Sequence, residues 1–177
     1  MKPVCLVLGA GAGIGGTVAA KFASEGYHSY LCRRSDQEGL DKLIKGIEDA
    51  GGSASGSLMN AIEENALEEV ITKVESDVGP IEVLVYNLGA QTGMKLLSQT
   101  THKEFEWGWR MASFGLFRVA KILCPIMAER GKGTFLVTSA TAAMRGNATQ
   151  HSHAAAMGAR RMLCQSLNAE FASKGLH

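Results

Sequence analysis

The 177-residue sequence predicts a doubly wound α/β fold, in which helices cover both faces of a mostly parallel β-sheet and form three layers. Three observations favour this fold class. Short apolar segments alternate with helical patterns, glycine is frequent (21 residues) while proline is rare (3 residues), and the first apolar segment leads directly into a glycine-rich loop. Because domains typically have about 100–200 residues, we expect residues 1–177 to form one domain.

Five short segments are predicted as strands, and one of them is a continuous apolar run, as expected of a parallel strand buried on both faces. Val4–Leu8 is the clearest of them, and Ala54–Leu58 is the weakest. The other predicted strands are Ser29–Cys32, Glu82–Tyr86 and Thr134–Thr138. Because a helical pattern separates each pair of strands, we expect crossover connections and a parallel sheet.

Apolar residues at helical spacing follow each predicted strand. In the second helix, Leu40, Leu43, Ile44 and Ile47 recur at this spacing, and two glycines after them end the helix. The predicted helices lie between Gly16 and Gly26, around Leu40–Ile47, over Ala66–Val78, over Phe105–Arg130 with an interruption or bend near Pro125, and over Ser152–Ser173.

The C-terminal residues suggest that the sheet continues. The sequence stops shortly after a helix, and Gly175–His177 have the pattern of the approach to another strand. The predicted strand Thr134–Thr138 would otherwise lie at the edge of the sheet without a neighbour. We therefore expect the domain to lack its C-terminal strand or strands.

Composition argues against several classes of partner. The net charge of +1 indicates neither a nucleic-acid partner nor binding to a membrane surface. No apolar run reaches the roughly 18 residues of a membrane span, and we expect no signal peptide before Val4–Leu8. The scattered cysteines form no C-x-x-C pair, so we expect reduced thiols in the cytoplasm and no metal site.

A glycine-rich loop joins the first strand to the first helix, with Gly9, Gly13, Ile14 and Gly15 in the pattern G-x-x-x-G-I-G. Glycine allows a tight turn and lets a diphosphate approach without a Cβ in the way. The amides and the dipole of the following helix attract the phosphates. The loop therefore predicts a dinucleotide site, and the alternative is a tight turn that binds nothing.

A second motif follows the fourth predicted strand, where Asn87 and Gly89 would lie at the carboxyl edge of the sheet, beside the glycine loop. The two motifs together resemble those of the short-chain dehydrogenase/reductase family, T-G-x-x-x-G-x-G and N-N-A-G. The resemblance covers essentially the whole chain and implies a Rossmann-like NAD(P)-binding domain. Further matching segments are Gly79–Val85, Gly133–Ser139 and Gln165–Glu170.

The resemblance also implies which residues meet the adenosine half of the dinucleotide. In the family, an acidic residue after the second strand selects NAD, and a basic one pairs with the 2′-phosphate of NADP. Arg33 and Arg34 occupy this place, so NADP(H) is favoured over NAD(H), unless the pair is only solvated. Asn60 stands where the family usually has an Asp facing the adenine. Asn87 either contacts the cofactor or ties adjacent strands together.

The catalytic positions depart from the family pattern. The usual Tyr, Lys and Asn are replaced by His153, Met157 and Ala112, while Ser139 keeps the serine position, fourteen residues before His153. An imidazole, with an ordinary pKa of about 6.5, exchanges protons at neutral pH without help from a cation. One hypothesis is therefore that His153 exchanges the proton and Ser139 orients the substrate. The other is that His153 is a non-catalytic residue of a degenerate site.

Other residues near the last helix and the long helix have weaker signals. His151 is an alternative candidate if the last helix begins after it, and Arg161 is expected on the surface. Residues 91–101 are expected to border the substrate pocket. In the family, the long helix and the last helix pack against a partner subunit, which implies a homodimer or homotetramer here. Trp107 and Trp109 lie on the long helix and would face in different directions.

Three functional hypotheses follow. By resemblance, the chain is an NAD(P)(H)-dependent oxidoreductase that prefers NADP(H) and acts on an unknown small-molecule carbonyl or alcohol. The alternative is a catalytically inactive relative that retains the nucleotide site and has a regulatory or structural role. A third hypothesis is a purely structural, oligomerising protein, for which neither NADPH nor NADH would raise the melting temperature.

Overall fold

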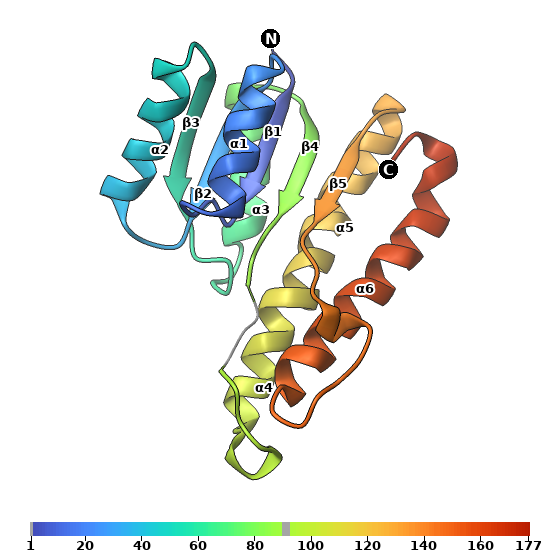
Figure 1. Cartoon of the computed structure of the whole chain (residues 1–177). Helices are drawn as coiled ribbons and strands as arrows, with labels where there is room; N and C mark the ends of the chain where they lie inside the picture. Colours follow the sequence, from blue (N-terminus) through green and yellow to red (C-terminus); the bar gives the residue numbers. More distant parts are fainter. Residues whose placement is uncertain (1, 90–92) are drawn as a thin grey trace.

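The computed structural model describes residues 2–89 and 93–177, and within them five parallel strands form one sheet of order β3-β2-β1-β4-β5 (Figure 1). This arrangement confirms the doubly wound α/β fold. Its direction of winding reverses between β1 and β4, which is where open α/β sheets bind ligands. The strands are β1 (Val4–Leu8), β2 (His28–Arg33), β3 (Ser53–Leu58), β4 (Ile81–Tyr86) and β5 (Thr134–Val137).

The longer helices form the two outer layers (Figure 1). Helices α1 and α2 pack on one face of the sheet, and α3, α5 and α6 pack on the other. The helices are α1 (Ile14–Ser24), α2 (Gln37–Asp49), α3 (Ala66–Lys73), α4 (His102–Trp109), α5 (Gly115–Arg130) and α6 (His151–Phe171). Short 3-10 turns span Leu97–Gln99, Thr141–Ala143 and Ala172–Lys174, and π-helical turns span Val74–Val78 and Arg110–Phe114.

Strand β1 shows why the strand segments are apolar throughout. Its side chains alternate between the two faces, so Leu6 and Leu8 enter the core under α3 and α5, while Cys5 and Val7 enter the core under α1 and α2. All of these residues are fully buried. A central strand covered by helices on both faces therefore needs apolar residues at every position.

The long helical stretch differs from the prediction in the position of its irregularity. An interruption near Pro125 is wrong, because Pro125 lies within α5 on its exposed side, whereas a bend there stays a prediction. The departure from α-helical geometry is instead the π-helical turn Arg110–Phe114, which separates α4 from α5 and contains the fully buried Ala112. Such turns are frequent at functional sites because they displace backbone carbonyls from the regular hydrogen-bond pattern.

By length and composition alone, the stretch His102–Arg130 is apolar enough to cross a membrane. Half of its most apolar part is buried inside the fold, however, and Leu116, Val119, Leu123 and Met127 belong to the core beneath α3 and α5. A core helix meets the same criteria as a membrane span. Its apolar character is therefore accounted for by packing on the sheet.

The C-terminal residues pair with the edge strand β5. Leu176 forms a parallel bridge with Gly133, the amide of Phe135 donates to the carbonyl of His177 over 2.7 Å, and the amide of His177 donates to the carbonyl of Gly133 over 3.0 Å. Residues 175–177 thus continue the sheet beside β5. That further strands follow stays a prediction.

Candidate functional site

Glycine is needed at two positions of the loop after β1 to close the turn. Gly9 has a φ of +96°, and a Cβ there would lie 2.7 Å from the carbonyl oxygen of Asn87. A Cβ on Gly15 would lie 2.9 Å from the Cα of Ala10. A Cβ on Gly13, in contrast, would meet no atom within 4 Å. Gly9 and Gly15 therefore close the loop, whereas Gly13 borders open space.

Backbone amides line the open side of this loop. The amide of Gly16 donates to the carbonyl of Gly11 over 2.8 Å, which closes the turn. Within the described part of the chain, the amides of residues 12–15 have no hydrogen-bond partner. They lie at the positive end of the α1 dipole, where Ile14 is exposed. Unpaired amides next to open space fit a diphosphate group.

Asn87 joins the ends of three strands. Its Nδ2 donates to the carbonyl of Gly9, after β1, over 3.0 Å, and its Oδ1 accepts from Oγ1 of Thr138, after β5, over 2.7 Å. Asn87 itself follows β4, so its side chain holds the carboxyl edge of the sheet together. Among the described residues, a Cβ on Gly89 would meet no atom within 4 Å.

A cavity of about 490 Å³ lies on the β2–β3 side of the loop, where its lining includes Arg34, Asn60 and Lys73. Arg33 does not line it, because its guanidinium pairs with Asp36 over 2.8 Å at the start of α2. The structure therefore separates the two arginines, and Arg34 is the one beside the cavity. Sequence reasoning missed Lys73 on α3, which lines this cavity together with the carboxylates of Glu63 and Glu69.

A second cavity of about 330 Å³ lies at the ends of β4 and β5. It brings together Ser139 and His153, as well as Asn87 and Met157. His153 lines the cavity, and its Nδ1 is buried and has no hydrogen-bond partner among the described residues. Met157 is buried against Ala112 in a small apolar cluster, where it fills space and offers no charge.

Arg160 also lines this cavity, and sequence reasoning missed it. Its guanidinium donates to the carbonyls of Ala112 over 2.9 Å, Thr138 over 2.8 Å and Leu88 over 2.7 Å. It also lies 5.1 Å from the centre of the Tyr86 ring, and the residue is 1% exposed. Arg161, which the sequence analysis placed on the surface, is exposed as expected. Helical spacing was the available signal, because residues three apart share a face and residue 160 follows position 157 by three.

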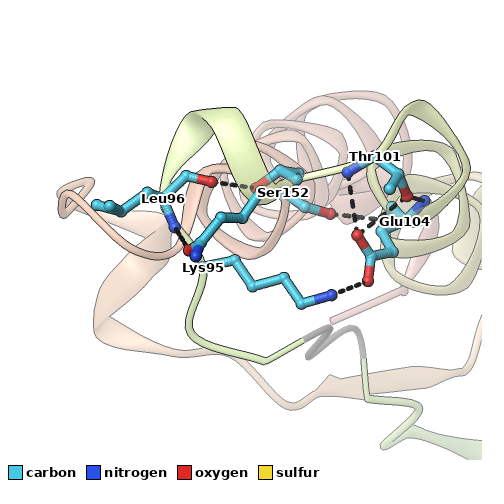
Figure 2. A network of polar contacts seen from close by, with 7 residues as sticks. Lys95, Leu96, Thr101, Glu104 and Ser152 are labelled. Carbon is cyan, nitrogen blue, oxygen red and sulfur yellow. Dashed lines mark hydrogen bonds and ion pairs between the residues drawn. The ribbon is translucent and has the colours of Figure 1, made fainter.

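Polar contacts link the first turn of α6 to α4 and to the segment that precedes α4 (Figure 2). Ser152 donates its hydroxyl to the carbonyl of Glu104 over 3.1 Å. The carboxylate of Glu104 in turn pairs with Lys95 and accepts from the amide of Thr101 over 3.0 Å. Helix α6 begins at His151, so that residue is helical and does not lie in a preceding loop. This network holds the turn that carries His153.

The segment expected to border the substrate pocket is described only from residue 93. Gln91 and Thr92 lie outside the described residues, as does Ala90, the last residue of the motif that begins at Asn87. From there, the amide of Lys95 donates to the carbonyl of Thr149 over 2.8 Å. The segment is therefore attached to the loop that leads into α6, on the His153 side of the cavity.

The hydrogen bonds of Glu104 lead us to predict how the stability of the fold depends on pH in the acid range. Hydrogen bonds from Lys95 and from Thr101 lower the pKa of Glu104 from 4.5 to about 2. A depressed folded-state pKa contributes stability above the unfolded-state value, and this contribution is lost as pH falls from about 4.5 towards 2. Between these values we expect Glu104→Gln to flatten the pH dependence of the melting temperature. Glu106→Gln, which removes an exposed carboxylate from the same helix, is the control, and equal flattening in both variants would contradict the prediction.

The sequence matches the family model described as short chain dehydrogenase over residues 3–177. The chain belongs to the short-chain dehydrogenase family. It is 30% identical over 152 residues to the 3-oxoacyl-[acyl-carrier-protein] reductase FabG of Thermotoga maritima, an alignment that covers 86% of this chain and 61% of that protein. It is 25% identical over 169 residues to the 2,3-dihydro-2,3-dihydroxybenzoate dehydrogenase of Bacillus subtilis, covering 96% of this chain and 64% of that protein.

Solved structures of the family share the fold. A short-chain dehydrogenase from Rhodopseudomonas palustris superposes with a TM-score of 0.93 at 30% identity, covering 99% of this chain and 81% of that one. A gluconate 5-dehydrogenase from Burkholderia cenocepacia, in complex with NADP and tartrate, superposes with a TM-score of 0.89 at 27% identity, covering 99% and 68%. This member of the family thus spans about three fifths of the length of the two curated relatives while retaining the fold of the solved structures.

Proposed function

We propose that this short-chain dehydrogenase family member binds NADP(H) in preference to NAD(H) and transfers hydride between the dinucleotide and a small carbonyl compound or alcohol. The observation that carries the proposal is the row of unpaired amides at residues 12–15, next to open space at Gly13. The diphosphate would lie there, because the glycine loop crosses the point where the direction of winding reverses. The adenosine would then extend towards Arg34, and the nicotinamide towards His153.

The chain's own residues would act on the substrate oxygen. When bound, the nicotinamide supplies or accepts the hydride. Ser139 would donate a hydrogen bond to the substrate oxygen, and His153 would exchange a proton with it. Both residues line the same cavity, and this placement supports the assignment. The bonds from Asn87 to the strand ends would keep the two halves of the site in register.

The choice of dinucleotide is tested by titrating the protein with NADPH and with NADH. We expect NADPH to bind more tightly, because Arg34 would pair with the 2′-phosphate. Arg34→Ala should then weaken NADPH binding roughly tenfold and leave NADH binding unchanged, as expected for one lost charge-assisted hydrogen bond. Arg33→Ala is the matched control, because Asp36 already engages Arg33. If neither dinucleotide binds or raises the melting temperature at millimolar concentration, the proposal fails.

A second candidate function is a nucleotide-binding relative without activity. The observation that favours it is the apolar surface at two of the expected catalytic positions, where Met157 packs against Ala112. Such a protein would bind NADPH with saturation but would not oxidise it with any carbonyl compound. Turnover that is lost on changing His153 would reject this alternative.

We also propose a homo-oligomer formed through the helices beside the cavity. Trp109, Phe114 and Phe117 stack in sequence and are each between 38% and 46% exposed. An exposed aromatic row of this kind is typical of a protein interface. Light scattering should give a mass of two or four chains, and a monomeric mass would contradict the proposed homo-oligomer.

The cytoplasm is the proposed location, because the four cysteines are all unpaired.

A further inference from the structure

Arg160 is a buried cation without an acidic partner. Three backbone carbonyls accept its hydrogen bonds, but none of the described acidic side chains forms an ion pair with it. The Tyr86 ring beside it carries no charge, because burial raises the pKa of its phenol and its hydroxyl donates to the carbonyl of Met111. Carbonyl dipoles lower the cost of burying a charge but do not neutralise it.

The charge of Arg160 acts on the cavity that would hold the nicotinamide. None of the described residues that line this cavity is acidic, and Arg160 is the one arginine or lysine among them. The three carbonyls fix the guanidinium at the ends of β4 and β5, so it cannot swing away from the cavity. Because Arg160 itself is buried, its fixed charge is screened less than a surface charge and acts over several ångströms.

We propose that Arg160 makes this cavity favour the reduced dinucleotide over the oxidised one, and so favours the reductive direction of the reaction. The inference rests on the proposed function, because it requires the nicotinamide to enter the cavity. The oxidised nicotinamide ring carries a positive charge, whereas the dihydronicotinamide ring is neutral. A nearby cation repels the first and leaves the second unaffected.

The binding ratio of the two redox forms tests this proposal without a known substrate. Titrations of the wild-type protein with NADPH and with NADP⁺ should show at least about tenfold tighter binding of NADPH, the order expected for two charges several ångströms apart in a medium of intermediate dielectric. In Arg160→Met, which retains the length of the side chain without its charge, the ratio should fall by about the same factor. Arg160→Lys, which keeps the charge, should retain the ratio.

Arg161→Met is the matched control, because it removes an exposed cation from the next position of α6. Melting curves identify variants that fold, and Arg160→Gln replaces Arg160→Met if the latter does not. Equal affinity of the wild-type protein for NADPH and NADP⁺ overturns the inference while leaving the proposed function intact. An unchanged ratio in a folded, uncharged variant overturns it as well. If neither form binds the wild-type protein, the proposed function falls together with the inference.

Discussion

Replacing Gly13 with Asp is expected to abolish dinucleotide binding while the protein stays folded. A side chain at this position would enter open space, because a Cβ there meets no atom within 4 Å. Gly13 is the N-cap of α1, where Asp is a favoured residue. Its φ of −88° and ψ of −128° lie outside the α and β regions, so we expect Asp there to shift the local backbone at a modest cost in melting temperature. The new carboxylate would occupy the place of the diphosphate and repel it. We therefore expect an affinity for NADPH at least about a hundredfold lower, because two like charges about 4 Å apart near a protein surface repel by about 4 kcal/mol.

The measurement is a NADPH titration combined with a melting curve of the free protein. Gly13→Ala separates the charge from the volume, because it adds only a methyl group to the open space, and its affinity should fall less. Gly15→Ala provides the structural contrast, since its Cβ would press on the backbone of Gly9 and Ala10 and lower the melting temperature. Undiminished NADPH binding by Gly13→Asp would show that the diphosphate lies elsewhere.

The contrast between these glycines shows how much of the loop the sequence determines. The motif predicts a turn and a phosphate site, but it does not distinguish the glycines that close the turn from the one that borders open space. That difference depends on Asn87, which lies far away in the sequence and whose carbonyl meets a Cβ on Gly9. Strands β1 and β4 were predictable to within one residue because burial on both faces makes them almost entirely apolar.

The irregularity between α4 and α5 was not predictable from local sequence. Proline is the usual signal for a break, yet Pro125 lies within a continuous helix. The π-helical turn occurs instead where two carbonyls accept long-range hydrogen bonds, that of Met111 from the Tyr86 hydroxyl and that of Ala112 from Arg160. Both donors lie on other elements, so only the tertiary structure reveals why the helix departs from α geometry there.

The candidate site was predictable where a residue follows a strand and not where its role depends on burial. Asn87 and Ser139 follow β4 and β5, and parallel strands bring such positions to one edge of the sheet. The sequence did not indicate which of the neighbours Arg33 and Arg34 would face the dinucleotide. The structure distinguishes them, because Arg33 forms an ion pair with Asp36. Arg160 was missed because an arginine is usually exposed, whereas three carbonyls and an aromatic ring surround this one.

Replacing His153 with Gln is expected to reduce turnover at least about a hundredfold, the usual lower bound for loss of a general acid or base. Glutamine keeps a polar group of similar length at the cavity but cannot deliver a proton. The hydroxyl of Ser139 cannot take over this role, because an alcohol does not ionise near neutral pH without a neighbouring base. The measurement is NADPH oxidation with a panel of carbonyl compounds, after NADPH binding by the variant has been verified.

His151→Gln is the matched control, because His151 belongs to the same turn of α6 but does not line the cavity. The network of Lys95, Glu104 and Ser152 should hold that turn in both variants. Loss of turnover in His153→Gln alone assigns the proton transfer to His153, because a disturbance of the turn would affect both variants. Full turnover in His153→Gln removes His153 from the chemistry. Binding of NADPH with no turnover by the wild-type protein favours the inactive relative.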